Sequence, residues 1–299
     1  MRSSTLADQA TPHLRLRVAG PRAVAGRRYG KALPGGHSSP AGLHARPWLA
    51  RLRNAVENDL FAVHYQPIVA LEDGRPAHYE ALVRLADEPS GAYLAPGRFL
   101  PAAERYGLIQ DIDRLVLDRV AALLGDRTSR ASAGRTRDRA EGPRIAINLS
   151  ALSVTDPAML GHVERSLDRY GVDPGRLIVE ITETAAISDM AQAQAFCRGA
   201  VALGCGLALD DFGSGFGSFQ YLTNLPFDYL KIDGSFIRSL PDSPKDQLIV
   251  RALAGLARNM GMQTIAEYVT SKATLSLLRT FGVDYAQGYE LGRPAPLIG

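Results

Sequence analysis

Short apolar stretches that end in a polar residue alternate with longer stretches of helical periodicity through most of this chain. Several of the short stretches are apolar throughout, as at 177–179 and 206–209. Strands of this kind are typical of parallel sheets whose two faces are both covered. Eight stretches qualify as strands: 61–69, 78–85, 144–149, 176–182, 206–211, 229–232, 263–267 and 285–289.

Helical patterns lie between these strands, and their spacing defines the fold class. They cover about 98–124, 154–170, 189–204, 217–223, 244–261 and 271–281, and the helix near 244 is expected to be capped by Asp242 or Ser243. Eight strands that alternate with helices over about 240 residues predict an α/β fold, a (β/α)8 or TIM barrel.

Two segments do not follow this alternation. Residues 1–47 are rich in Arg, Pro and Gly and predict a disordered tail, although a transit peptide has a similar composition. The barrel domain is expected over 48–299, with a short helix from Trp48 to about Asp59, and 126–143 is expected to be a basic surface insertion.

The net charge of +3 does not describe the expected barrel. Residues 1–50 carry an excess of seven positive charges and 126–144 an excess of three, which leaves −7 for the remainder. Without aromatic residues among the arginines of 126–144, the sequence argues against nucleic-acid binding. No apolar run reaches the roughly 18 residues of a membrane span, and no signal peptide is recognisable, so a cytoplasmic protein is expected.

Polar side chains lie within or directly after most of the predicted strands. In a barrel of this kind the carboxyl ends of the strands form the active site, so these side chains are expected to meet in one place. They are Glu80, Asn148, Glu180, Glu183, Asp210, Asp211, Lys231, Glu267 and Gln287.

A group of carboxylates inside a barrel needs compensating positive charge, because burying an unpaired charge is costly. Lys231 and Arg84 are the only candidate cations near the predicted strand ends. Oxygen donors without His or Cys favour Mg²⁺ or Mn²⁺. The adjacent Asp210 and Asp211 allow one carboxylate to bridge two ions, as in two-metal phosphodiester sites, where one ion lowers the pKa of the attacking water. Single acids at strand ends can instead cap helices or form surface ion pairs.

Eight short motifs, in order and with characteristic spacing, resemble the EAL-domain family over about residues 55–296. They are YQPIV (65–69), EALVR (80–84), NLS (148–150), EITE (180–183), DDFG (210–213), KID (231–233), AE (266–267) and QGY (287–289). The resemblance implies a modified TIM barrel whose first strand is antiparallel to the others. It also implies a bacterial phosphodiesterase that hydrolyses cyclic di-GMP to linear pGpG, works with two Mg²⁺ or Mn²⁺, and forms a homodimer through the barrel.

The resemblance also assigns roles to residues. Glu80, Asn148, Glu180 and Asp210 are implied as ligands of one metal, and Asp210, Asp211 and Glu267 as ligands of the other. Lys231, Glu267 and Gln287 are implied as catalytic residues that hold, activate or orient the water. Glu183 and Ser214 are implied to anchor the glycine-rich loop at 212–218. Arg84, Gln66 and Asp233 are expected to contact substrate, although an ion pair for Arg84 and a turn-stabilising role for Gln66 are alternatives.

Four positions depart from the family pattern. Tyr268 and Thr270 stand where the family usually has Gly and Glu, and Phe216–Gly217 stands where Tyr–Ser is usual. These departures keep open a second reading, in which the chain is a weak or inactive receptor for cyclic di-GMP that acts through a partner. Because every implied metal ligand is present, the sequence favours the enzyme.

Overall fold

A computed structural model describes residues 46–87, 90–131, 143–183, 189–213 and 220–296. The first helix, α1 (Arg46–Glu57), begins two residues before the expected Trp48. The predicted tail at 1–47 therefore lies outside the described residues except for its last two. Ser214 and Gly217 of the glycine-rich loop also lie outside them.

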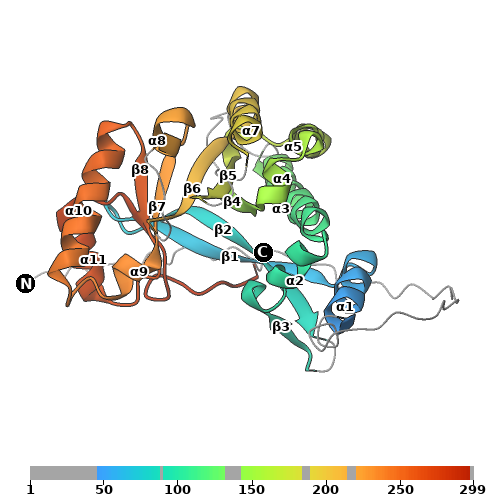
Figure 1. Cartoon of the computed structure of the whole chain (residues 1–299), viewed down its shortest axis with the longest axis horizontal. Coiled ribbons are helices and arrows are strands. Elements are labelled where there is room, and N and C mark those ends of the chain that lie inside the picture. Colours follow the sequence, from blue (N-terminus) through green and yellow to red (C-terminus); the bar gives the residue numbers. More distant parts are fainter. Residues whose placement is uncertain (1–45, 88–89, 132–142, 184–188, 214–219, 297–299) are drawn as a thin grey trace, which may run out of the picture.

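Eight strands form the barrel, and they match the predicted stretches closely (Figure 1). In chain order they are β1 (Phe61–Ala70), β2 (Pro76–Asp87), β4 (Arg144–Leu149), β5 (Leu177–Thr182), β6 (Gly206–Phe212), β7 (Tyr229–Ile232), β8 (Gln263–Ala266) and β9 (Tyr285–Ala286). Neighbours along the chain pair with one another, and β1 closes the ring by pairing with both β2 and β9. β1 is antiparallel to both partners, whereas the other barrel pairs are parallel. The expected reversed first strand is confirmed.

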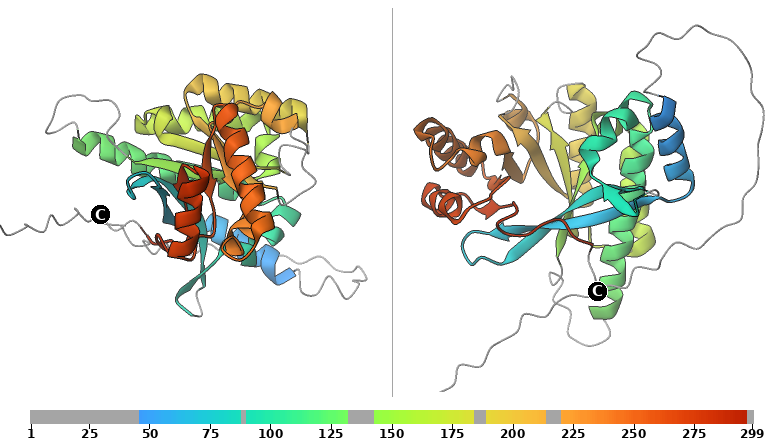
Figure 2. Two further views of the ribbon diagram at one scale, coloured as in Figure 1. Left: turned by 90° about the vertical axis from the view of Figure 1, so that its left-hand side faces the viewer. Right: turned by 90° about the horizontal axis from the view of Figure 1, so that it is seen from below.

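Helices cover the outside of the barrel, as the two further views in Figure 2 show. The longer ones are α3 (Ile109–Ala131), α5 (Pro157–Tyr170), α7 (Met190–Leu203), α10 (Pro244–Asn259) and α11 (Lys272–Phe281). The short ones are α2 (Leu100–Arg105), α4 (Ala151–Val154), α8 (Gln220–Asn224) and α9 (Gly234–Arg238). Sequence signals fix several ends: Ser243 caps α10 by accepting a hydrogen bond from the Asp246 N–H, with Pro244 in the first turn.

The structure differs from the predicted elements in several places. The expected helix at 98–124 is two helices, because the chain turns at Gly107, whose φ of 67° is a left-handed conformation. A short strand that was not predicted, β3 (Ala92–Leu94), pairs with the end of β2. The first six residues of the expected insertion at 126–143 continue α3 as far as Ala131, and residues 132–142 lie outside the described part.

The interior of the barrel is filled by one layer of apolar side chains, which is separate from the larger core between strands and helices. This layer consists of Ile68, Ala146, Ile178, Ala208, Tyr229 and Ile265, with Tyr285 packed against it. His78 lies among them, with its ring centroid 5.2 Å from that of Tyr229 and 4.9 Å from that of Tyr285. The layer closes one end of the barrel, so that polar side chains beyond it share a single opening.

The buried His78 should make folding stability depend on pH. Neither ring nitrogen has a hydrogen-bond partner among the described residues, and burial lowers the pKa of His78 from 6.5 to about 4. The neutral ring is therefore favoured in the folded state. Its contribution to the free energy of unfolding is fully present above pH 6.5 and is lost as the pH falls toward 4. Between pH 7 and pH 5 the free energy of unfolding should fall by about 2 kcal/mol from this group.

Urea unfolding of the wild type and of His78→Leu at both pH values measures this contribution. The variant should lose about 2 kcal/mol less than the wild type on acidification. An equal loss in both proteins would show that His78 does not titrate as its burial implies.

Candidate active site

A polar residue lies two positions from the residue at the level of the apolar layer in each barrel strand, either within the strand or directly after it. In β2 the residue at the level of the layer is His78. Side chains two apart on a strand point to the same face, so this step places the polar residues inside the barrel, directly above the layer. In β5, for example, Ile178 belongs to the layer and Glu180 lies above it. The resulting set, named here the polar ring, is Gln66, Glu80, Asn148, Glu180, Asp210, Lys231, Glu267 and Gln287.

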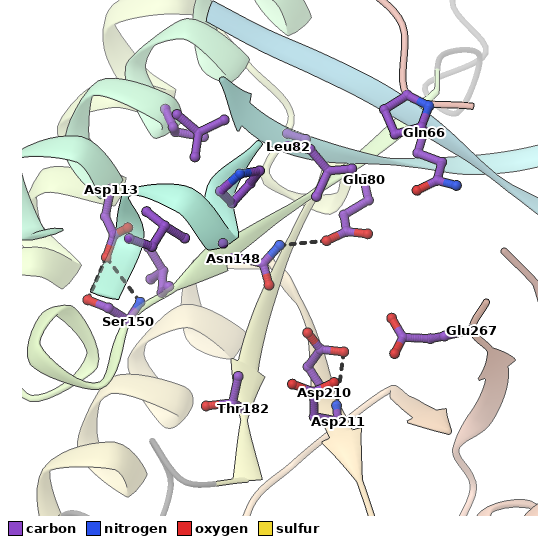
Figure 3. Close-up of a pocket in the computed structure, with 18 of the residues that line it drawn as sticks. Gln66, Glu80, Leu82, Asp113, Asn148, Ser150, Thr182, Asp210, Asp211 and Glu267 are labelled. Carbon is purple, nitrogen blue, oxygen red and sulfur yellow. Dashed lines mark hydrogen bonds between the residues drawn. The ribbon is translucent and has the colours of Figure 1, made fainter. Parts of the chain in front are cut away.

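Six residues of the polar ring, all except the deeper Glu180 and Lys231, line a cavity of about 930 Å³. Figure 3 shows Glu80, Asn148, Asp210, Asp211 and Glu267 directed toward a common space. Asp210 and Asp211 are neighbours in β6, Glu80 and Asn148 lie in β2 and β4, and Glu267 directly follows β8. The cavity continues away from the ring between β2, α3 and α4, where its lining is largely apolar. One side of it is therefore acidic and the other suits a flat apolar group.

Lys231 is the cation at the centre of the polar ring. Its side chain is 1% exposed, and Nζ lies 2.7 Å from Glu180 Oε2, 2.9 Å from Asp210 Oδ1, 3.0 Å from Glu267 Oε1 and 3.9 Å from Glu80 Oε2. Burial alone would lower the pKa of Lys231, but these four carboxylates together raise it well above its usual value. In this arrangement the ammonium form of Lys231 is favoured, and it donates a hydrogen bond to Glu180 Oε2.

Amide side chains hold Glu80 in place from both sides. Asn148 Nδ2 donates to Glu80 Oε1 at 2.6 Å, and Gln287 Nε2 donates to Glu80 Oε2 at 2.5 Å. Gln287 Nε2 also donates to Gln66 Oε1 at 3.2 Å, and Gln66 Nε2 donates to the carbonyl of Gly292 at 3.0 Å. These bonds fix the orientation of the Glu80 carboxylate and connect β1 to the C-terminal segment.

Asp210, Asp211 and Glu267 form a compact group in which one oxygen of each lies within 4.8 Å of the others. Asp211 has a φ of 56°, a conformation that is unusual for a residue other than glycine, and this turn brings its carboxylate beside that of Asp210. Burial and then the charge of Asp210 raise the pKa of Asp211 to about 6. A non-glycine residue held in this conformation at a cavity is typical of functional sites.

The donor set of the polar ring fits divalent ions. Burial raises the pKa of Glu180, and raises that of Glu267 to about 8, despite the nearby ammonium, so one cation does not fully compensate these carboxylates. Glu180 Oε1 is buried without a hydrogen-bond partner among the described residues. Carboxylate and amide oxygens without His or Cys are the ligands of Mg²⁺ and Mn²⁺.

The remaining predicted residues are placed differently. Arg84 lines the cavity, donates to the Val83 carbonyl at 2.9 Å and forms no ion pair within the described part of the chain, so the alternative structural ion pair is not seen. Asp233 caps α9 by accepting from the Ser235 N–H at 2.8 Å and is not part of the cavity lining. Glu183 is buried and accepts from the Gly213 N–H at 3.5 Å, at the start of the glycine-rich loop.

Asp113 is a buried carboxylate of the cavity wall that the sequence interpretation missed. Its Oδ2 accepts hydrogen bonds from the Ser150 N–H at 3.0 Å and the Ser150 hydroxyl at 2.7 Å (Figure 3). It also accepts one from the Ser153 hydroxyl at 2.6 Å. Oδ1 accepts none from a described residue. A signal was available, because Asp113 interrupts the apolar face that Ile109, Ile112 and Val116 give to the helix.

The comparisons with known proteins agree with this geometry. The family model described as the EAL domain matches residues 49–294. The cyclic di-GMP phosphodiesterase PdeB of Shewanella oneidensis is 36% identical over 85% of this chain, which covers 29% of PdeB. The cyclic di-GMP phosphodiesterase PdeF of Escherichia coli is 35% identical over 83% of this chain and 32% of PdeF. The chain spans about a third of the length of these two relatives.

Two solved structures have the same fold. The PaMucR phosphodiesterase in complex with c-di-GMP is 35% identical, with a TM-score of 0.76 over 84% of this chain and 98% of that one. The EAL domain of FimX from Xanthomonas citri in complex with c-diGMP is 29% identical, with a TM-score of 0.75 over 87% of this chain and 97% of that one. No helix in the described part of this chain has the length and apolar character needed to cross a membrane.

Replacement of Lys231 by methionine should destabilise the fold when divalent ions are absent. The substitution keeps the apolar stem but leaves the carboxylates around Nζ without a cation, which costs about 3–5 kcal/mol for a buried group of this kind. Urea unfolding at pH 8 in EDTA measures the loss. Lys245→Met, at an exposed lysine of α10, is the matched control and should change little.

Addition of Mn²⁺ should restore much of the stability of Lys231→Met, because a bound cation replaces the missing charge. A variant as stable as the wild type in EDTA would contradict the electrostatic role given to Lys231.

Proposed function

Because this chain belongs to the EAL domain family, we propose that it hydrolyses one phosphodiester bond of cyclic di-GMP and releases linear pGpG. Water adds to phosphorus, the bond from phosphorus to the 3′-oxygen breaks, and that oxygen takes up a proton. The observation that carries the proposal is the complete polar ring: each barrel strand contributes the donor or the cation that such a reaction needs.

Two Mg²⁺ or Mn²⁺ ions are the proposed cofactors. Glu80, Asn148, Glu180 and Asp210 would hold one ion, and Asp210, Asp211 and Glu267 would hold the other. When bound, such ions supply an activated water and neutralise charge on the phosphate oxygens. The clustering of Asp210, Asp211 and Glu267 and the unpartnered Oε1 of Glu180 support this assignment.

The chain's own side chains have separate tasks in this proposal. Lys231 keeps the carboxylates in place as an ammonium and donates a hydrogen bond that orients the attacking water, with Glu267 beside it. Gln287 and Gln66 hold Glu80 in the orientation described above. Arg84, which lines the cavity, carries a guanidinium suited to a phosphate oxygen of the substrate.

The remaining expectations stay predictions about the same protein. Glu183 and Ser214 are proposed to anchor the glycine-rich loop. The sequence predicts a substrate contact for Asp233, but because this residue caps α9 and does not line the cavity, we propose instead that it acts by holding α9. A homodimer through the barrel and a cytoplasmic location are also part of the proposal. Cys197 and Cys205, both buried and free, fit a reducing compartment.

Loss of a ring carboxylate should abolish hydrolysis. Glu80→Ala or Asp210→Ala removes a proposed ligand and should lower the rate at least about a thousandfold, while the far-UV spectrum stays that of the wild type. The assay separates cyclic di-GMP from pGpG by chromatography, with Mn²⁺ or with EDTA. Wild-type activity that persists in either variant would contradict the site.

The same assay distinguishes an enzyme from a receptor. An enzyme forms pGpG in Mn²⁺ and none in EDTA. A wild-type chain that binds cyclic di-GMP without turnover under both conditions would support the receptor and contradict the proposed hydrolysis.

Asp113 should matter for substrate binding and not for the chemical step. Asp113 lines the largely apolar part of the cavity, where a carboxylate can accept the N–H groups on the edge of a guanine. Asp113→Asn keeps the shape but replaces charge by an amide, and KM for cyclic di-GMP should rise about tenfold with kcat little changed. Asp111→Asn, at an exposed position of the same helix, is the control, and an unchanged KM in Asp113→Asn would contradict the assignment.

A further inference from the structure

Tyr268 follows Glu267 directly and lines the same cavity. Its side chain remains 53% exposed, which is unusual for a large aromatic residue at a cavity wall. Its φ of 53° is a left-handed conformation that a tyrosine adopts at an energetic cost. The surroundings must therefore favour this placement of the ring over the more relaxed alternatives.

Helix α9 supplies the contacts that hold the ring. A Cβ at Gly234, the first residue of α9, would lie 2.2 Å from Tyr268 Cδ2, so only glycine leaves room for the ring. Four residues later, the guanidinium carbon of Arg238 lies 4.2 Å from the ring centroid. A cation at this distance is attracted to the ring face and adds to the packing. Both contacts come from α9.

The part of the ring that α9 does not cover is available to a ligand in the cavity. Thr270, two residues further along, lines the same wall and carries no charge there. Tyr289, also exposed and in the cavity lining, lies on a neighbouring segment that is joined to this loop by a hydrogen bond from the Val269 N–H to the Gln287 carbonyl at 2.9 Å. This rim offers aromatic surface, whereas the floor offers carboxylates.

We propose that Tyr268 is a substrate-contacting residue whose ring stacks against one purine base of the dinucleotide. Aromatic side chains bind nucleobases through stacking, which needs a flat, exposed and fixed ring. Gly234 and Arg238 fix the ring, so that little side-chain freedom is lost when the base binds. The inference rests on the proposed function, because it takes the substrate to be a purine dinucleotide whose phosphate lies on the polar ring.

Steady-state kinetics with cyclic di-GMP and Mn²⁺ test the proposal. Tyr268→Ala should raise KM about tenfold and leave kcat within about a factor of two, whereas Tyr268→Phe, which keeps the ring, should behave as the wild type. Tyr93→Ala is the matched control, because Tyr93 is 52% exposed but does not line the cavity. An unchanged KM in Tyr268→Ala, or a fall in kcat alone, would overturn the proposal, and the second result would assign Tyr268 to the positioning of Glu267.

A double variant distinguishes two roles of Arg238: holding the Tyr268 ring in place, or contacting the substrate directly. Arg238→Ala alone should raise KM about two- to threefold relative to the wild type, because the Tyr268 ring is then held less firmly. The double variant Tyr268→Ala/Arg238→Ala should have the same KM as Tyr268→Ala. A full additive effect in the double variant would show that Arg238 acts independently and would overturn its role behind the ring.

Equilibrium binding separates this inference from the proposed hydrolysis. Tyr268→Trp places an indole at the rim, and its fluorescence should fall when cyclic di-GMP is added, whereas Tyr93→Trp should show no change. If the wild type binds cyclic di-GMP without hydrolysing it, a tenfold weaker Kd of Tyr268→Ala in calorimetry would uphold the stacking and contradict the hydrolysis. Equal Kd values would overturn the stacking alone, and no binding by the wild type would overturn both.

Discussion

The contact between the Lys231 ammonium and the carboxylates around it is the interaction on which the rest of the structure depends. Four acids from four different strands approach one nitrogen within 2.7–3.9 Å inside a closed barrel. Such a group of like charges is tolerated because a cation lies among them and because Asn148 and Gln287 donate hydrogen bonds to Glu80. The same need for positive charge makes the site suitable for divalent ions and for the phosphate that they bind.

The two-residue repeat of β-strands explains how the sequence builds this site with so few residues. Most strands give one side chain to the apolar layer and the next inward side chain to the polar ring, as Ile178 and Glu180 do in β5. In the reversed β1 the order along the chain is inverted: Gln66 of the polar ring precedes Ile68 of the layer, and Gln66 pairs with Glu80 of β2. The layer excludes water from below, and this exclusion strengthens every electrostatic interaction in the ring.

Most of the fold and the polar ring could be predicted from the sequence, because apolar runs locate the strands and a polar residue at each strand end is rare without a function. What the sequence could not supply depends on tertiary contacts. The break at Gly107 is a single left-handed residue inside a helical pattern. In the sequence, Asp113 is a single acid on an otherwise apolar helix face. Its role becomes visible only in the structure, where it packs against Ser150 in the cavity wall. The reversal of β1 followed from the family resemblance and not from periodicity.

The most direct measurement of the central claim is the number of Mn²⁺ ions bound per chain, counted by equilibrium dialysis at pH 8 for the wild type and for Asp210→Asn. If divalent ions neutralise the negative charge of the polar ring, the wild type should bind two ions. Asp210→Asn, which lacks the proposed bridging carboxylate, should bind at most one. A wild-type chain that binds no Mn²⁺ at millimolar concentration would contradict the account, because Lys231 would then be the sole compensation of the ring.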